Sequence, residues 1–255
     1  MGYLGNQITT VFPTSISVDS ATINGNTDIN GDTAKLTLTD TSSHSANTGP
    51  EVSFFSKDSG GTSREVAKIV GESHSGSNEG NLAFQTRNGG TLETKWKIFK
   101  NGNMLPSNSA YGIYLGTTSV SDSNLLDDYE EGSWTPSVAG NTTYNNQRGR
   151  YVKIGNQVNL WFYIQINQRN SPGVPYIVGG SPFTNSSQVA GSGLVHYFQS
   201  IQNSAVVLTC RIDTGGANIN VSGATGSSTT IANVNHDWVG NGSEVYGFVT
   251  HYVGS

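Results

Sequence analysis

The side chains that usually do chemistry are thinly spread along this chain. The sequence contains 18 Asp and Glu residues, 5 His residues and a single Cys, and only 12% of its residues are charged. It contains no G-x-S-x-G, H-E-x-x-H, phosphate-loop or dinucleotide-binding pattern. The single thiol, Cys210, lies in the apolar run AVVLTCRI, where a small buried hydrophobic side chain is the simplest interpretation. We therefore expect neither enzymatic activity nor a bound cofactor.

Two arrangements of carboxylates come closer to a site. The segment DINGD, Asp28 to Asp32, has the first ligand spacing of a calcium loop, but Thr33 replaces the sixth-position Gly and Thr39 replaces the final Glu. Turn capping by short polar side chains explains this segment better, so we expect no metal. A glycosidase needs two carboxyl groups facing each other across a sugar. No spacing selects such a pair among the acidic residues of the second half, Glu130, Glu131, Asp213, Asp237 and Glu244.

One loop combines the side chains that a sugar ring requires. The stretch NVNHDWVGNGS contains His236, Asp237, Trp238 and Asn241, a flat apolar ring together with planar hydrogen-bonding groups. Tyr197, in LVHYFQS, offers the same mixture. These five residues are the predicted glycan contacts. The alternative is an ordinary loop in which Trp238 packs on the body of the domain.

The composition predicts an all-β chain. The 255 residues include 32 Gly and are rich in Ser, Thr and Asn, which are the residues of tight turns. Helical periodicity is absent, whereas short alternating runs separated by turn residues recur along the sequence. We therefore expect many short strands, and the length suffices for one large domain or two to three small ones.

Charge and hydropathy exclude several classes of partner. Residues 1–128 hold 8 Lys and Arg against 13 Asp and Glu, and residues 129–255 hold 5 of each, so the basic surface that a nucleic-acid binder needs is missing. No stretch of 18 apolar residues and no signal-peptide pattern occurs, so membrane insertion is not expected. A single Cys leaves no disulfide framework, which fits synthesis in the cytoplasm.

The middle of the chain, residues 36–120, is predicted to be a β-meander. The run TLETKWKIFK alternates in polarity, which predicts one face formed by Leu92, Thr94, Trp96 and Ile98. The sequences RNGG, Arg87 to Gly90, and KNGN, Lys100 to Asn103, are hairpin signals. The acidic stretch 121–133 is then expected to be a linker or a short neck.

Residues 134–255 are predicted to form a jelly-roll-like β-sandwich head, because about eight strand-like runs are split by Gly, Asn and Pro turns. In QVNLWFYIQI one face is aliphatic, but Trp161 and Tyr163 make the other face aromatic. In EVYGFVTHYV the second face carries Tyr246, Phe248 and Tyr252. A solitary antiparallel sheet normally exposes one face to water, so we expect these three residues to contact another subunit.

The N-terminal 35 residues suggest the same need for partners. Ile-Asn-Gly occurs at Ile23 and again six residues later at Ile29, which is too few turns for a self-supporting solenoid. Three parallel chains winding around one another would bury these isoleucines on a common axis, together with Val18. We therefore predict an interwound trimeric shaft over residues 20–35. Residues 1–19, apolar side chains in a polar background, are predicted to be an anchoring segment, with a disordered tail as the alternative.

Two sequence patterns at the start of the predicted head resemble a known family. The first, L-x-D-Y-E-x-G-x-W-T-P, is formed by Leu126, Asp128, Tyr129, Glu130, Gly132, Trp134, Thr135 and Pro136. The second, G-x-Y-x-K-I-G-x-x-V, is formed by Gly149, Tyr151, Lys153, Ile154, Gly155 and Val158, and GSPF, Gly180 to Phe183, also has a counterpart. Together they resemble the C-terminal heads of virion fibre proteins of tailed bacteriophages, especially marine and cyanobacterial ones.

The resemblance extends to the rest of the chain. The middle segment GNLAFQTRNGGTLETKWKIFKNGNMLPSN is similar to the shaft repeats of such fibres, and MGYLGNQ is similar to their N-terminal starts. The resemblance implies a parallel homotrimer in the virion, held by another virion protein through residues 1–19, on the tail, neck or capsid. Its distal head would touch host-surface polysaccharide. It implies no catalytic residues. A carbohydrate-binding module and a polysaccharide depolymerase tailspike are the alternatives.

Overall fold

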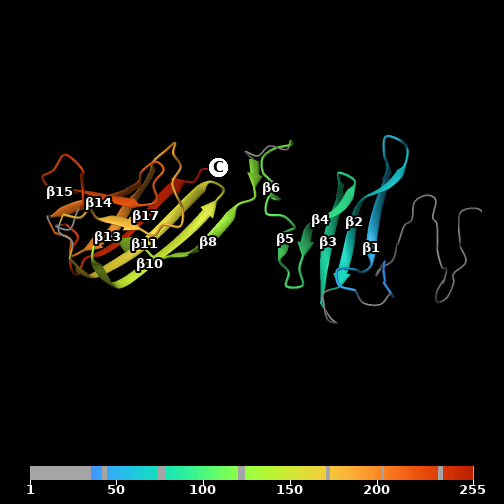
Figure 1. Cartoon of the computed structure of the whole chain (residues 1–255), viewed down its shortest axis with the longest axis horizontal. Coiled ribbons are helices and arrows are strands. Elements are labelled where there is room, and N and C mark those ends of the chain that lie inside the picture. The colour runs from blue at the N-terminus through green and yellow to red at the C-terminus, as the bar shows by residue number, and fades with distance from the viewer. Residues whose placement is uncertain are drawn as a thin grey trace, which may run out of the picture. The chain divides into compact units, whose positions relative to one another are not determined.

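The computed structural model describes residues 36–41, 45–73, 79–119, 124–170, 173–202, 204–234 and 238–254. These residues form strands, turns and loops without an α-helix, which confirms the all-β prediction (Figure 1). The chain divides into two compact units, Met1–Met104 and Leu105–Ser255. The predicted anchor and shaft, with Val18, Ile23 and Ile29, lie outside the described residues.

The first unit contains one antiparallel sheet in which consecutive strands are neighbours. Its strands are β1 (Glu51–Lys57), β2 (Ser63–Ser73), β3 (Gly80–Asn88), β4 (Thr91–Ile98) and β5 (Met104–Pro106). The predicted hairpin at RNGG joins β3 to β4, with positive φ at Gly89 (55°) and Gly90 (99°), a conformation that glycine adopts without strain. The predicted turn at KNGN lies between β4 and β5.

The strand β4 does not keep the strict alternation that its sequence suggests. Trp96 lies opposite Phe84, but Thr94 lies opposite Gln85, so Lys95 is an extra, bulged residue. Phe84 and Gln85 are consecutive on β3 and therefore point to opposite faces. The predicted single apolar face of β4 is wrong. Because of the bulge, Leu92 and Thr94 lie on the opposite side of the sheet from Trp96 and Ile98.

The second unit begins with a small two-stranded sheet of β6 (Ile113–Tyr114) and β7 (Leu125–Leu126). The other described strands of this unit form one sheet in the order β8-β10-β11-β17-β13-β14-β15-β12-β9, with β16 paired to β15. Their bounds are β8 (Tyr129–Trp134), β9 (Ser137–Val138), β10 (Thr142–Ile154), β11 (Gln157–Arg169), β12 (Ile177–Gly179), β13 (Gly191–Gln199), β14 (Ala205–Ile212), β15 (Ile219–Thr225), β16 (Ala232–Asn233) and β17 (Glu244–Tyr252).

The structure bears on three predictions about this region. For the sandwich, the structure shows one continuous sheet that curls into an open half-barrel in place of two stacked sheets, because β12 and β9 extend it beyond β15 (Figure 1). Residues 129–133, from the segment 121–133 predicted as a linker or neck, belong to β8 and pair with β10. The two compact units divide after Met104, within β5, and the predicted division at residue 120 stays a prediction.

The curled sheet encloses the hydrophobic core of the second unit. Side chains from successive strands point to its concave side and are removed from water. The most completely buried of them are Leu160, Ile164, Val178, Leu208, Ile212, Ile219, Val245 and Val249. Cys210 belongs to the same cluster, and burial raises the pKa of its thiol to about 12. This thiol is therefore inert at neutral pH, as the sequence suggested.

The residues that carry the family resemblance hold β8 against β10. Trp134 lies directly opposite Gly149, and Tyr151 lies directly opposite Gly132. A Cβ atom built on Gly149 would lie 2.5 Å from the Trp134 ring, and one built on Gly132 would lie 2.7 Å from the Tyr151 ring. Glycine is therefore required at both positions, because each aromatic ring lies across the neighbouring strand.

Polar and aromatic contacts complete this strand pair. The Tyr151 hydroxyl donates a hydrogen bond to the Glu130 carboxylate, and Lys153 forms an ion pair with Asp128. Phe183, from GSPF, packs edge-on against Tyr151 with 4.9 Å between ring centroids. All these motif residues therefore have structural roles in joining the first strand of the sheet to the core.

One buried group in the core is ionisable. His251, on β17 opposite Val158, is fully buried. Its ring nitrogens make no hydrogen bond of good geometry with the described residues. Burial lowers the pKa of His251, and a weaker interaction with the backbone of Tyr252 opposes this shift. The neutral imidazole is therefore the form that the folded protein favours.

We predict that stability falls as the pH drops below about 6.5, the pKa of an unperturbed histidine. The folded-state pKa of His251 lies below the unfolded one, so its contribution is complete above pH 6.5 and is lost as the pH falls toward the folded-state value. The free energy of unfolding then falls by at most about 1.4 kcal/mol per pH unit. Unfolding in urea between pH 8 and 5 measures this dependence. His251→Leu should flatten the curve, whereas the exposed control His196→Gln should not; equal curves for all three proteins would contradict the prediction.

We predict that Gly149→Ala destabilises the second unit by about 1–3 kcal/mol, the usual cost of overpacking a core. The added methyl group would overlap the Trp134 ring. Denaturant unfolding measures the change. Gly226→Ala is the matched control, because the nearest atom to its added Cβ would be 3.5 Å away. Equal free energies of unfolding for the two variants would show that Trp134 can move aside.

Candidate functional site: an exposed aromatic face

The two faces of β11 are both apolar, but only one is covered. Leu160 and Phe162 point into the core and are buried. Trp161, between them, points to the opposite face and is 44% exposed. Tyr163 lies on the same outer side and is half-buried. The sequence predicted this two-sided pattern, and the structure shows that the described residues leave the outer side open.

Strand pairing extends this outer side over three strands. Trp161 of β11 lies opposite Phe248 of β17, which lies opposite Leu194 of β13. In the next row, Tyr163 lies opposite Tyr246, which lies opposite Tyr197. Two cross-strand rows therefore form one patch, which we call the aromatic face: Trp161, Tyr163, Leu194, Tyr197, Tyr246 and Phe248.

The rings of the aromatic face pack closely against one another. Tyr163 and Tyr246 are stacked, with 4.2 Å between ring centroids and an interplanar angle of 13°. Tyr197 meets Tyr246 edge-on at 5.4 Å. The His196 ring lies at the border of the patch, 6.3 Å from Tyr246 and 6.4 Å from Phe248. Such cross-strand aromatic pairs order a sheet surface.

The tyrosine hydroxyls already have partners within their own strands. Tyr197 donates to the Gln199 side chain at 2.8 Å, and Tyr246 donates to the Glu244 carboxylate at 3.1 Å. Tyr163 makes a longer contact, 3.4 Å, with the side chain of Gln165. A polar row of Gln165, Glu244 and Gln199 therefore borders the aromatic rows.

Burial raises the pKa of Tyr163 strongly, and the neighbouring Tyr246 hydroxyl and Glu244 carboxylate add to the shift. The phenol therefore stays neutral at any physiological pH. The aromatic face thus carries no charge of its own in its two aromatic rows. It offers flat apolar area rather than an acid or a base.

The predicted subunit contacts of the head lie on this side of the sheet. Tyr246 and Phe248 are central to the aromatic face, and Phe248 is 37% exposed. Tyr252 lies further along the same side of β17, opposite Gln157, and is 50% exposed. Sequence reasoning noted the aromatic side of β11 but did not place Leu194 on it. A register shift between Val195 and Tyr197 disturbs the alternation of β13, and the sequence gives no clear signal of that shift.

Of the five predicted glycan contacts, three lie among the described residues, and Tyr197 and Trp238 lie on opposite sides of the sheet. Tyr197 lies on the aromatic face, whereas Trp238 packs on the core side, next to Leu208. A Cβ atom built on Gly223 would lie 2.8 Å from the Trp238 ring. Asn241 accepts a hydrogen bond from the Arg169 amide at 2.6 Å. His236 and Asp237 lie outside the described residues.

The contacts around Arg169 explain why Asn241 is held in place. The buried guanidinium of Arg169 donates to the Val239 carbonyl at 3.0 Å and to the Val174 carbonyl at 2.9 Å. Its charged carbon lies 5.5 Å from the centre of the Tyr176 ring. These bonds tie the end of β11 to the loop before β17, so Asn241 has a structural role there.

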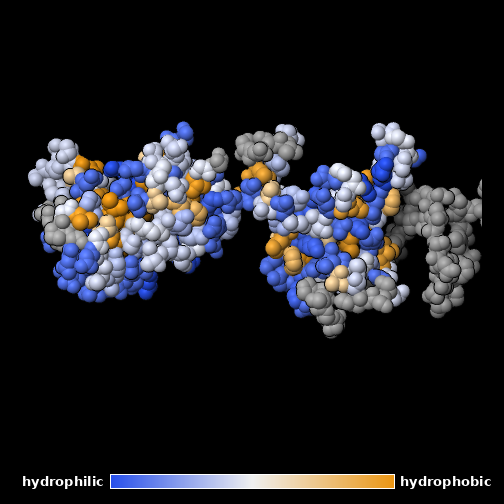
Figure 2. Space-filling view, in the orientation of Figure 1, coloured by the Kyte–Doolittle hydropathy of each residue, from blue (hydrophilic) through white to orange (hydrophobic). Residues whose placement is uncertain are grey.

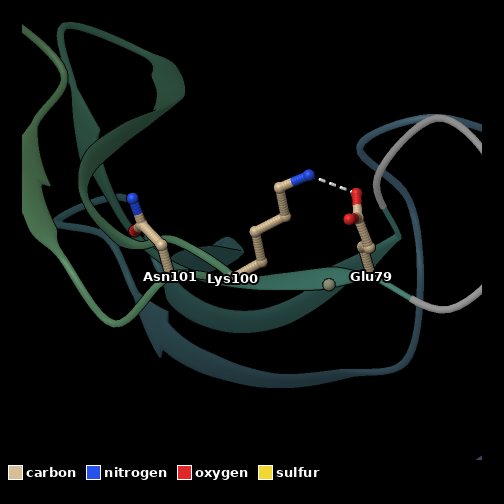
Figure 3. A pocket seen from close by; sticks show the side chains of 4 residues that line it. Glu79, Lys100 and Asn101 are labelled. Atoms are coloured by element: carbon tan, nitrogen blue, oxygen red, sulfur yellow. Dashed lines mark hydrogen bonds and ion pairs between the residues drawn. The ribbon is translucent and has the colours of Figure 1, made fainter.

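Other features of the described residues offer little chemistry. No three His, Cys, Asp or Glu side chains among them come together as a metal site requires. A shallow recess in the first unit is lined by Glu79, Gly80, Lys100 and Asn101, and the charges of Lys100 and Glu79 pair with each other (Figure 3). Within the described ranges no helix is long and apolar enough to span a membrane.

We predict that Trp238→Ala lowers the free energy of unfolding by about 2–4 kcal/mol, because the indole fills space over Gly223 that alanine would leave empty. Chemical denaturation measures this, with the exposed Val189→Ala as control. An unchanged free energy of unfolding combined with weaker adsorption to host cells would instead assign Trp238 to a glycan site.

Comparison of the chain with protein-family models, with curated proteins and with solved structures gives no match.

Proposed function

We propose that the protein is a structural component of a bacteriophage virion, a homotrimeric fibre without enzymatic activity. Residues 1–19 attach it to another virion protein, residues 20–35 form an interwound shaft, and the second unit is the distal head. The head contacts polysaccharide on the host surface. This proposal keeps the expectation drawn from the resemblance, and one structural observation supports it best.

The supporting observation is the uncovered aromatic face. Trp161, Tyr197 and Phe248 expose 44%, 46% and 37% of their surface, side by side on one sheet whose other face is already a complete core. Contiguous apolar patches of this kind on a folded unit mark interaction surfaces. A second copy of the same chain is a suitable partner, because closed symmetry brings identical patches together around an axis.

The roles of the motif residues are consistent with a structural protein. Gly132, Gly149, Trp134 and Tyr151 fix the first strand of the sheet through close contacts between rings and glycines. The resemblance to fibre heads thus rests on residues that specify a local fold. This supports a shared architecture and adds no argument for catalysis.

A carbohydrate-binding surface is the second candidate. The polar row of Gln165, Glu244 and Gln199 borders the aromatic rings, and planar amide and carboxylate groups beside exposed rings suit sugar hydroxyls and sugar faces. A monomeric module of this kind would leave the aromatic face free for its ligand. A trimer would cover it, so the mass in solution separates the two functions.

We predict that light scattering of the full chain gives three times its 27.0 kDa mass. Phe248→Lys should shift the mass toward that of one chain, because it places a charge where the subunits exclude water. Ile231→Lys, at an exposed loop position, is the control and should leave the mass unchanged. A wild-type mass of one chain, with loss of glycan binding in Phe248→Lys, would favour the carbohydrate-binding module.

A further inference from the structure

The sheet of the first unit also has an apolar side, formed by residues that face the same way on four strands. Val52, Ile69, Phe84 and Trp96 lie in one row across β1 to β4. The row on one side continues through Leu82 and Ile98, and the row on the other side runs through Phe54 and Ala67 and ends in the polar residues Thr86 and Glu93. We call this surface the β1–β4 face: Val52, Phe54, Ala67, Ile69, Leu82, Phe84, Trp96 and Ile98.

The opposite side of the same sheet carries the charges. Lys97 pairs with Glu72 at 2.7 Å, and Lys68 pairs with Glu51 at 2.8 Å. On this side Val70 is 4% exposed and Glu72 only 3%. The buried residues of this unit, within the described part of the chain, therefore lie on the polar side.

The residues of the β1–β4 face are more exposed than the buried residues of the polar side. None of its side chains is buried among the described residues, and Val52, Phe54 and Leu82 expose 42%, 48% and 38% of their surface. Hydrophobic surface is visible on this unit in Figure 2. A stable domain needs two packed layers around a core, and the described strands of this unit supply one. A second layer must come from elsewhere.

The chemistry of the face selects its partner. The rows through Phe84 and Leu82 contain no charged residue, and the indole N–H of Trp96 is their one side-chain hydrogen-bonding group, so this surface offers little to a nucleic acid or a charged peptide. Identical copies of these two rows can meet without like-charge repulsion. Glu93, at the corner of the face, is paired with Lys95 at 2.6 Å.

We infer that the β1–β4 face is an interface at which copies of this chain pack their sheets against one another, supplying the second layer that each sheet lacks. The inference rests on the proposed trimer and extends it: the meander section adds its own apolar contacts to those of the aromatic face in the second unit. Each unit then has its own subunit interface.

Phe54 and Phe55 provide a matched pair for the test. They are adjacent on β1, Phe54 points to the β1–β4 face, and Phe55 points to the polar side with 65% exposure. The photoreactive analogue p-benzoylphenylalanine replaces one or the other in the full chain. After illumination, a denaturing gel and mass spectrometry of the cross-linked peptides identify what each position touches.

We expect position 54 to give a product of two chains, linked to β1–β4 residues of the other copy, and position 55 to give several times less of it. A cross-link from position 54 into residues 1–35 of its own chain would show that this segment covers the face, and would overturn the inference. So would equal yields at the two positions. If either of these two results is found while light scattering gives the wild type the mass of a trimer, the inference fails and the proposed function stands. A wild-type mass of one chain would contradict both the inference and the proposed trimer.

Discussion

The structure depends on one constraint: a β-sheet has two faces, and each apolar face must be kept from water. The second unit satisfies it on one side by curling, so that Ile164, Leu208 and Ile219 become fully buried within a single sheet. On its other side the same sheet presents the aromatic face. The sheet of the first unit buries Val70, Glu72 and Ala83 on its polar side only. Both units therefore carry apolar surface that the described chain does not cover.

Curling is possible because large and small residues alternate on the concave side. Along one row, Phe162 lies between Gly149 on β10 and Gly247 on β17, and Trp134 lies on the far side of Gly149. A Cβ on Gly247 would be 2.3 Å from the Phe162 ring. A flat sheet could space bulky side chains evenly, but a curved one crowds them together, so each ring requires a glycine beside it. The glycines of the motif are thus a consequence of curvature.

The sequence predicts the strands of the second unit well and their assembly less well. Runs such as Gln157 to Asn167 and Ala205 to Ile212 coincide with β11 and β14, because alternation and turn residues are local signals. Two features are not local. Whether β12 and β9 start a second sheet or extend the first depends on long-range pairing, and the bulge at Lys95 shows in no residue type. The aromatic side of β11 could be predicted; Trp238 could not be placed, because a half-buried ring over Gly223 and a sugar-binding ring have the same sequence signal.

The polar atoms of the aromatic face bear on what can cover it. Burying a hydroxyl without a partner is costly, so an aromatic surface suited to a dry interface must satisfy its own donors. Tyr197 and Tyr246 do so through Gln199 and Glu244 on their own strands. A sugar would have to compete for these groups, whereas a protein surface needs only to exclude water from the rings. The internal hydrogen bonding of the tyrosines therefore favours a subunit contact over a ligand site.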